Sequence, residues 1–417
     1  MLRIIAIACL GAFCLAACGG GGSDLNTNGP GGVVTTPAAN VQSVTVDGGP
    51  PQLANPTANT LYTSVTICVH GTTNCQTIDH IQVDTGSSGF RILASALTLT
   101  LPQQTDGNNN PIVECTQFID GYSWGPLRTA DVQVSGESAA NIAVQVIGDA
   151  TYTTVPSDCA STGTAEDTLD SFGANGILGV GPFISDCGAA CTTSPNTVYF
   201  TCPTATTCAD AAVAEAQQVS NPVAFFATDN NGVILQLPSI SASGDATVSG
   251  ALVFGIGTQS NNGLGTAKVY AVDPGNGSMV TTYNGAALTD SFIDSGSNAY
   301  YFPDSSIPTC PSNSPAPGFF CPTSTLSLSA TLQGATVNGV VGASSTVEFA
   351  IANAMNLFDV STAIAAVDDL GAPSSTSNGF DGANSFDWGL TFYFGRTVYT
   401  AIEQRNTSAG MGPYFAF

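Results

Sequence analysis

Apolar and polar residues alternate in short stretches along most of the chain. Residues 41–46, 130–134 and 142–146 each show this pattern. A period of two places successive side chains on opposite faces of a β-strand, so these stretches are predicted to be strands with one buried face. Clusters of Gly, Pro, Asn and Ser separate them, as turn residues do. The pattern predicts an all-β fold.

Helical periodicity is rare. Only residues 209–219 and 362–370 are expected to form short helices. The composition agrees with this picture, because 46 Gly, 23 Pro and only 9% charged residues suit strands and turns better than long helices. A length of 417 residues exceeds one ordinary hydrophobic core, so two domains or two large lobes are expected.

The N-terminus has the features of a bacterial lipoprotein signal. Residues 1–17 carry one positive charge, at Arg3, and an apolar run too short to span a membrane as a mature helix. The run ends in a Leu-Ala-Ala-Cys quartet that resembles the lipobox, in which the cysteine, here Cys18, receives lipid. A simple signal peptide with an incidental cysteine is the competing interpretation. Residues 18–40 are then a lipidated flexible linker. We expect an exported protein of the bacterial cell envelope, with acyl chains as its membrane anchor and the outer membrane favoured.

Charge and cysteine content narrow the possible partners and cofactors. Six Lys and Arg against 30 Asp and Glu give a net charge of −24, so nucleic acid is not an expected partner. Of the 13 cysteines, ten lie beyond Cys18, an even number that suits disulfides in an oxidising compartment. A zinc site is disfavoured because only two histidines exist and no paired Cys-x-x-Cys spacing occurs, and we expect neither metal nor cofactor. The predicted disulfides are Cys68–Cys75, Cys115–Cys159 and Cys310–Cys321, while Cys187, Cys191, Cys202 and Cys208 allow three pairings.

The most informative feature is an internal repeat. The sequence Val-Asp-Thr-Gly-Ser at 83–87 recurs as Ile-Asp-Ser-Gly-Ser at 293–297, each time after a short apolar strand. A glycine follows each aspartate at the same distance of 95 residues, at Gly179 and at Gly389. Equal spacing indicates two copies of one lobe, predicted to cover residues 41–221 and 222–417 and called here the first and second halves.

Two aspartates delivered by related halves can face each other across a pseudo-twofold axis. Asp84 and Asp294, called here the aspartate pair, would then share a proton over a range of acidic pH, because two close carboxylates cannot both ionise at low cost. One carboxylate can deprotonate a water that attacks an amide carbonyl, while the other carboxyl protonates the oxyanion. This chemistry requires no metal and no covalent nucleophile.

The neighbours of the aspartate pair suit this chemistry. The hydroxyls of Thr85 and Ser295 can connect the two loops by reaching backbone groups, and the side chains of Ser87 and Ser297 can bind the outer carboxylate oxygens. Gly86 and Gly296 permit tight turns that bring a backbone N–H close to each carboxylate. One Asp-Thr-Gly sequence is more often a structural turn, but a pair of them after apolar strands is not expected by chance.

These motifs resemble those of the pepsin-like aspartic peptidases, and the resemblance runs from Val41 to Phe417. Residues 84–89 match the first active-site motif and residues 294–297 the second. Residues 118–125 resemble the flap hairpin that covers the substrate, 176–181 resemble the segment behind the first aspartate loop, and 388–400 resemble the closing stretch of the second lobe. The chain also resembles uncharacterised bacterial lipoproteins with the same motif. The resemblance implies a bilobal acid protease fold of two pseudo-twofold-related β lobes, an interlobe cleft, a monomer and a peptide or protein substrate.

Two positions depart from the family pattern. The family's flap tyrosine falls on Phe118, so its role would pass to Tyr122 or Trp124. Trp124 is expected at the hairpin tip, either in contact with substrate or packed on its own hairpin. Asp387 replaces an apolar residue just before Gly389. A third carboxylate there would raise a pKa of the aspartate pair or serve another purpose, and the side chain could equally point outward. Arg91, close to the first motif, is expected to pair with a nearby Asp rather than with substrate.

The leading hypothesis is therefore an aspartic endopeptidase that binds an extended peptide as a strand in the interlobe cleft. The alternative is a catalytically inactive surface lipoprotein that binds peptide or protein, because a fold does not determine a function. A purely structural surface protein leaves the paired motifs unexplained.

Overall fold

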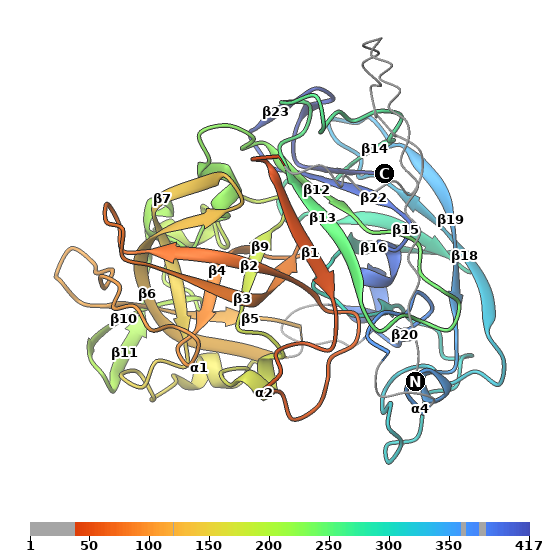
Figure 1. Cartoon of the computed structure of the whole chain (residues 1–417), viewed down its shortest axis with the longest axis horizontal. Coiled ribbons are helices and arrows are strands. Elements are labelled where there is room, and N and C mark those ends of the chain that lie inside the picture. The colour runs from red at the N-terminus through yellow and green to blue at the C-terminus, as the bar shows by residue number, and fades with distance from the viewer. Residues whose placement is uncertain (1–37, 120, 360–363, 375–380) are drawn as a thin grey trace, which may run out of the picture.

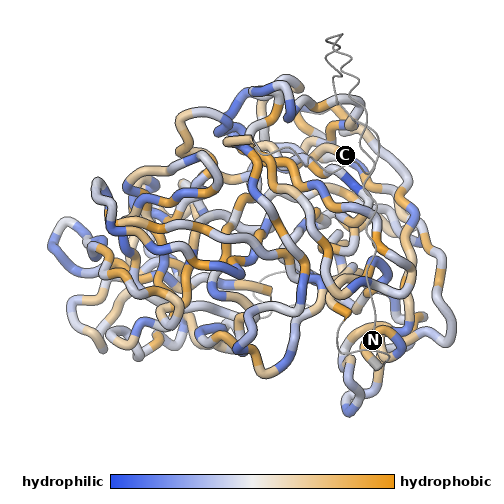
Figure 2. Tube along the Cα trace, viewed as in Figure 1, coloured by the Kyte–Doolittle hydropathy of each residue, from blue (hydrophilic) through white to orange (hydrophobic). Residues whose placement is uncertain are grey.

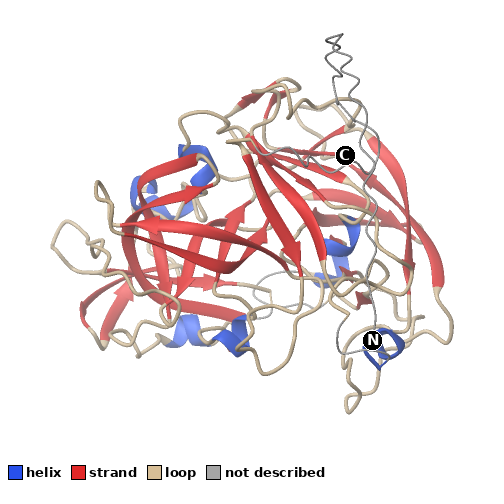
Figure 3. Cartoon of the chain, viewed as in Figure 1, coloured by secondary structure: helices blue, strands red, loops and turns tan. Residues whose placement is uncertain are grey.

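Strands dominate the chain. The computed structural model describes residues 38–119, 121–359, 364–374 and 381–417. Strands make up 42% of it and helices 8%, which confirms the prediction of a mostly β protein (Figure 3). Within these described residues, no helix combines the length and apolar character needed to cross a bilayer. The predicted signal segment, Cys18 and nearly all of the linker lie outside the described residues.

The described residues of the first half form eleven strands and four short helical turns. The strands are β1 (Val41–Val46), β2 (Leu61–Cys68), β3 (Cys75–Asp84), β4 (Ser88–Leu93), β5 (Ile112–Gln117), β6 (Gly121–Val134), β7 (Glu137–Ile147), β8 (Thr164–Ala165), β9 (Gly176–Val180), β10 (Tyr199–Thr204) and β11 (Thr207–Asp210). The helical turns are α1 (Ser157–Ala160), α2 (Leu169–Phe172), α3 (Ala190–Thr193) and the 3-10 turn η1 (Glu215–Gln217).

The described part of the second half forms fourteen strands and four short helical turns. Its strands are β12 (Gly232–Gln236), β13 (Val248–Phe254), β14 (Val269–Ala271), β15 (Met279–Tyr283), β16 (Ala286–Ile293), β17 (Tyr300–Tyr301), β18 (Leu326–Gln333), β19 (Ser344–Ile351), β20 (Gly371–Ala372), β21 (Asp387–Trp388), β22 (Thr397–Ala401), β23 (Asn406–Thr407), β24 (Gly410–Met411) and β25 (Tyr414–Ala416). Its helical turns are η2 (Pro222–Phe225), α4 (Ala354–Asp359), η3 (Gly382–Asn384) and η4 (Leu390–Phe392).

One 16-stranded sheet connects the two halves, with the order β11-β10-β5-β6-β7-β4-β9-β3-β2-β1-β13-β12-β22-β25-β14 and β8 paired with β6 at its side. The connection is β1, which pairs with β2 on one edge and runs antiparallel to β13 from Val41↔Val253 to Val46↔Val248 on the other. Figure 1 shows β1, in red, beside the green β13 at the centre of the molecule. The first strand of the described chain is therefore shared between the two halves.

The order of strand pairings around each aspartate is the same. In the first half, β3 runs parallel to β9, β9 runs antiparallel to β4, and β4 runs parallel to β7. In the second half, within a seven-stranded sheet, β16 runs parallel to β21, β21 antiparallel to β17, and β17 parallel to β20. The sequence repeat therefore corresponds to a repeat of topology.

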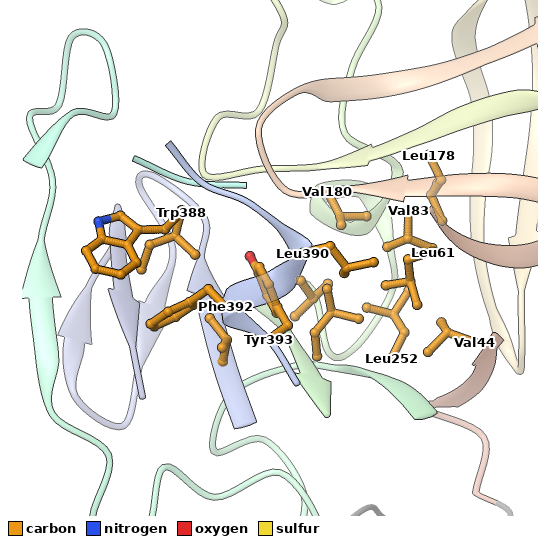
Figure 4. Packing of buried hydrophobic residues seen from close by; sticks show 14 of the residues in the cluster. Val44, Leu61, Val83, Leu178, Val180, Leu252, Trp388, Leu390, Phe392 and Tyr393 are labelled. Atoms are coloured by element: carbon orange, nitrogen blue, oxygen red, sulfur yellow. The ribbon is translucent and has the colours of Figure 1, made fainter. Parts of the chain in front are cut away.

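The main hydrophobic core extends across the junction of the halves. Leu390 and Tyr393, in and just after η4, belong to the same buried cluster as Val83 and Leu178 of the first half (Figure 4). Each of these four side chains is at most 1% exposed. Hydrophilic residues concentrate in the peripheral loops, as the hydropathy along the trace shows (Figure 2). The core therefore holds the loops that follow β3 and β16 from both sides.

Five disulfides are present in the described residues. The three predicted pairs, 68–75, 115–159 and 310–321, all form. The remaining four cysteines pair as neighbours, Cys187 with Cys191 and Cys202 with Cys208. The last of these closes the hairpin of β10 and β11.

The two predicted helices are wrong for the residues that the structure describes. Residues 209–219 begin in β11, which pairs with β10, and contain only the 3-10 turn η1. Residues 364–370 are not helical either, because their backbone groups bond to distant segments: the N–H groups of Ala365 and Ala366 both donate to the carbonyl of Asp245. Tertiary pairing overrode the weak local helical preference in both places.

Candidate active site

The loops after β3 and β16 bring Asp84 and Asp294 together. Asp84 pairs with Gly179 across β9, and the N–H of Asp294 donates to the carbonyl of Trp388 at 3.1 Å. A Cβ atom at Gly86 would lie 2.5 Å from Cγ of Asp294, and one at Gly296 would lie 2.6 Å from Oδ1 of Asp84. Each loop therefore needs its glycine because the aspartate of the opposite loop occupies the space of a side chain.

Two hydroxyl groups connect the loops in a reciprocal way. The N–H of Thr85 donates to Oγ of Ser295 at 3.1 Å, and the N–H of Ser295 donates to Oγ1 of Thr85 at 3.0 Å. Oγ of Ser295 also donates to the carbonyl of Val83 at 2.8 Å. Both side chains are at most 1% exposed. The loops are therefore held against each other by buried hydrogen bonds, as expected from the sequence for these two residues.

Each carboxyl accepts hydrogen bonds from its own loop. Oδ1 of Asp84 accepts from the N–H of Gly86 at 2.6 Å and from that of Ser87 at 3.3 Å, and Oδ2 accepts from the Ser87 hydroxyl. In the second loop, Oδ1 of Asp294 accepts from the N–H of Gly296 at 2.7 Å and Oδ2 from Oγ of Ser297 at 3.0 Å. The six predicted supporting residues thus all contact the aspartate pair or connect its loops.

Burial dominates the electrostatics of Asp294. Its pKa is raised well above the ordinary value, first by burial and then by the charges of Asp84 and Asp387, while the N–H of Gly296 opposes this shift. A carboxyl with a raised pKa retains its proton at a pH where an ordinary aspartate is ionised. The site therefore combines a proton-holding carboxyl with a second carboxyl that accepts three hydrogen bonds.

Asp387 adds a third buried carboxyl to the site. Strand β21 pairs it with Phe292 of β16 and with Tyr301 of β17, and its side chain is only 3% exposed. Burial raises its pKa well above the ordinary value, with a hydrogen bond from Ser297 acting in the opposite direction and the charge of Asp84 adding to the rise. Its Oδ1 has no hydrogen-bond partner.

A known protein family matches nearly the whole chain, including both aspartate loops. Residues 36–417 match a family described as "protein of unknown function (DUF3443)". The chain belongs to the DUF3443 family. No curated protein matches the sequence. Both aspartate loops and both halves lie inside the DUF3443 match.

Sequence reasoning missed one residue of the DUF3443 site. Tyr393 follows η4, and its hydroxyl lies 2.7 Å from Oγ1 of Thr85. The Tyr393 side chain is fully buried, and its pKa is raised well above the ordinary value, mainly by burial and against the hydrogen bond with Thr85. The two residues are 308 positions apart, so no local pattern could have connected them.

The segment expected to form a hairpin does so, with β5 and β6 paired from Val113↔Pro126 to Gln117↔Tyr122. Phe118 lies at the turn, where its N–H donates to the carbonyl of Gly121 at 2.8 Å and its ring meets Phe172 edge-on. The expected tip position of Trp124 is wrong, whereas the alternative of packing on its own hairpin agrees with the structure. Trp124 lies along β6 rather than at the tip, is 4% exposed, and donates from Nε1 to the carbonyl of Tyr152 at 2.8 Å.

Tyr122 and Trp124 belong to one buried cluster with the Cys115–Cys159 disulfide and Phe200. The Trp124 ring packs edge-on against Phe200. These two side chains therefore stabilise the hairpin from inside. Phe118 is the member of the predicted flap set that remains partly exposed.

Arg91 of this DUF3443 chain is buried and forms two ion pairs. Its guanidinium is 1% exposed and bonds to Glu114 at 2.7 Å and to Asp186 at 2.9 Å. Burial alone would lower the pKa of Arg91, but the two carboxylates more than offset this and raise it. Arg91 therefore neutralises buried acids.

Proposed function

We propose that this DUF3443 chain is an aspartic endopeptidase with a bilobal pepsin-like fold, its lobes formed by residues 41–221 and 222–417. The observation that carries the proposal is the reciprocal contact of the two loops, in which each glycine faces the aspartate of the opposite loop. Such an arrangement presents two carboxyls to one water molecule. An extended peptide bound as a strand between the lobes would place its scissile bond at the aspartate pair.

The two carboxyls take different parts in the proposed reaction. Asp84 accepts three hydrogen bonds, which suits a carboxylate, while Asp294 keeps the proton because burial and neighbouring charges raise its pKa. Water attacks the carbonyl carbon and gives one proton to Asp84, while Asp294 gives its proton to the carbonyl oxygen. The neutral diol then collapses. Its hydroxyl returns a proton to Asp294, the C–N bond breaks, and the amine leaves with the proton from Asp84.

We also propose export and lipid anchoring at Cys18 in the bacterial cell envelope. The lipobox-like quartet and the glycine-rich segment after it support this. A lipid anchor would hold the peptidase at a membrane surface without a spanning helix. Labelling of the full-length protein with a radioactive fatty acid, and loss of the label in Cys18→Ser, tests the anchor separately from the activity.

The activity test uses the soluble chain that begins after Cys18 and a diverse peptide library between pH 3 and 7. We expect cleavage that is abolished in Asp84→Asn and in Asp294→Asn and is blocked by a transition-state-mimicking inhibitor of aspartic peptidases. The matched control is Asp381→Asn, which makes the same change at an exposed aspartate that accepts from the Ala383 N–H, a bond that asparagine retains. No cleavage at any pH by folded protein contradicts the proposal.

Two observations favour a second candidate, an inactive peptide-binding protein. The hairpin turn presents Phe118, which has no hydroxyl to offer a substrate, and Asp387 adds a third carboxyl to the site. Isothermal titration with the same inhibitor and peptides distinguishes the two. Binding without cleavage supports this second candidate.

A further inference from the structure

The unpaired oxygen of Asp387 is a feature that the proposed reaction does not use. Oδ1 of this residue is buried and has no hydrogen-bond partner. Buried polar atoms almost always have a partner, and each exception requires an explanation. An unpaired buried charge is costly. An ionised Asp387 side chain would therefore stabilise the folded protein only with a positively charged group as its partner.

The position of Asp387 in the repeat indicates where that partner would come from. Asp387 lies two residues before Gly389, as Ile177 lies two residues before Gly179, and the two pair with equivalent strands: Ile177 with Gln82 of β3, Asp387 with Phe292 of β16. Ile177 and Asp387 are 4% and 3% exposed. Equivalent places beside the two aspartates thus hold one apolar and one acidic side chain.

The direction of the Asp387 side chain follows from its neighbours. Trp388, the next residue of β21, stacks on Phe386. The Trp388 side chain lies in the main buried core (Figure 4). Successive side chains of a strand point to opposite faces, so Asp387 faces away from Trp388. Its carboxyl interacts with the Ser297 hydroxyl, which also binds Asp294. The unpaired oxygen therefore lies beside the reacting groups.

We propose that Asp387 makes this site select peptides with a Lys or Arg residue directly beside the scissile bond. The inference rests on the proposed peptidase function. When an extended peptide binds across the pseudo-twofold axis, the side chain on one side of the scissile bond faces the first half and the side chain on the other side faces the second half. One of these side chains then contacts Ile177, and the other contacts Asp387. A substrate ammonium or guanidinium supplies the donor that Asp387 lacks, and the negative charge of the nearby Asp84 carboxylate strengthens its attraction.

A second observation agrees with a cationic substrate. The net charge of −24 draws positively charged peptides toward the protein. Among the described residues, Lys268 is the only exposed Lys or Arg side chain, and its Nζ bonds to the carbonyl of Ser344 and to Oγ of Ser345. A peptidase that selects Lys and Arg would therefore find few cleavage sites on its own surface.

The test uses pairs of peptides that differ only in lysine or norleucine at one flank of the scissile bond. Norleucine has the aliphatic length of lysine without its charge. We measure kcat/KM for the wild type, for Asp387→Leu and Asp387→Asn, and for the exposed control Asp381→Asn. Leucine restores an apolar residue like Ile177, and asparagine keeps the shape of the side chain. Circular dichroism melting curves verify that each variant is folded.

We expect the wild type to prefer lysine at one flank by about 10- to 100-fold, the range for a hydrogen bond to a charged group. Asp387→Leu should reverse this preference, taken as the ratio of kcat/KM for the two peptides, in which a loss of rate common to both cancels; Asp387→Asn should weaken the preference, and Asp381→Asn should retain it. Equal preference in the wild type and Asp387→Leu, with both active, overturns the specificity inference and leaves the peptidase function standing. Absence of cleavage of every peptide by the wild type contradicts the proposed function, and the specificity with it.

Discussion

The reciprocal hydrogen bonds between the aspartate loops give the most direct test of how the site is built. Replacing Thr85 by Val keeps the size and branching of the side chain and removes only its hydroxyl. The N–H of Ser295 and the hydroxyl of Tyr393 then lose a buried partner, at 3.0 Å and 2.7 Å in the native site. Each unpaired buried group costs about 1–3 kcal/mol. We expect the free energy of unfolding to fall by about 2–6 kcal/mol.

Urea-induced unfolding with intact disulfides measures this cost. The matched control is Thr66→Val, because the Thr66 hydroxyl bonds to that of Thr77 on an exposed face of the β2–β3 pair. There water replaces the lost partner, and the change should stay within about 0.5 kcal/mol. Ser295→Ala should be comparable to Thr85→Val, and the double variant should cost less than the sum, since the two residues share one set of bonds. If Thr85→Val and Thr66→Val cost the same, the loops are not held together by these hydroxyls.

Three further predictions concern other parts of the chain. Burial, with the charge of Asp368 adding, raises the pKa of Asp369 to about 6, so the folded state holds this proton more tightly than the unfolded chain. Its contribution to stability is present below about pH 4 and is lost as the pH rises toward 6; calorimetry should therefore show a smaller fall in Tm between pH 4 and 6 for Asp369→Asn than for the wild type, and an equal fall would contradict this pKa. Gly296→Ala should lower kcat/KM by about 100-fold or more, because its Cβ would displace the Asp84 carboxyl, whereas Gly263→Ala, with no atom within 4 Å of the added Cβ, should match the wild type; full activity of the first variant would refute the close contact of the loops. Arg91→Met leaves two buried carboxylates without their cation and should cost about 3–5 kcal/mol at pH 7, measured by urea unfolding, with a cost below 1 kcal/mol as the contrary result.

Several features of the molecule were predictable from patterns within the sequence. Alternation of apolar and polar residues indicated the strands, and the equal spacing of Gly179 and Gly389 from the two aspartates anticipated equivalent pairings, since Asp84 lies opposite Gly179 and Asp294 bonds to the carbonyl just before Gly389. Disulfide partners such as 68–75 and 310–321 were predictable because a short loop places their ends close together. The strands and these disulfides depend on a few neighbouring residues, whereas the equal spacing follows from the internal repeat.

Other features were decided only by tertiary packing. Trp124 was expected at a hairpin tip, yet the register of β5 and β6 places it opposite Cys115, inside a cluster that no local pattern describes. Residues 209–219 have a helical composition, but pairing of β11 with β10 fixes their first residues as a strand. In both cases the energy of burial and cross-strand pairing exceeds the small differences in local propensity.

The sequence by itself determined that two aspartate loops exist, that each has a glycine and a hydroxyl in the same place, and that the chain consists mainly of strands. Only the tertiary structure decided that Tyr393 completes the hydrogen bonds of Thr85 and that Asp387 turns inward rather than to solvent. The physical reason is the separation along the chain between the residues that interact. A motif records which groups are adjacent along the chain, whereas burial and pairing of polar groups depend on segments hundreds of residues apart that meet only when the core closes around them.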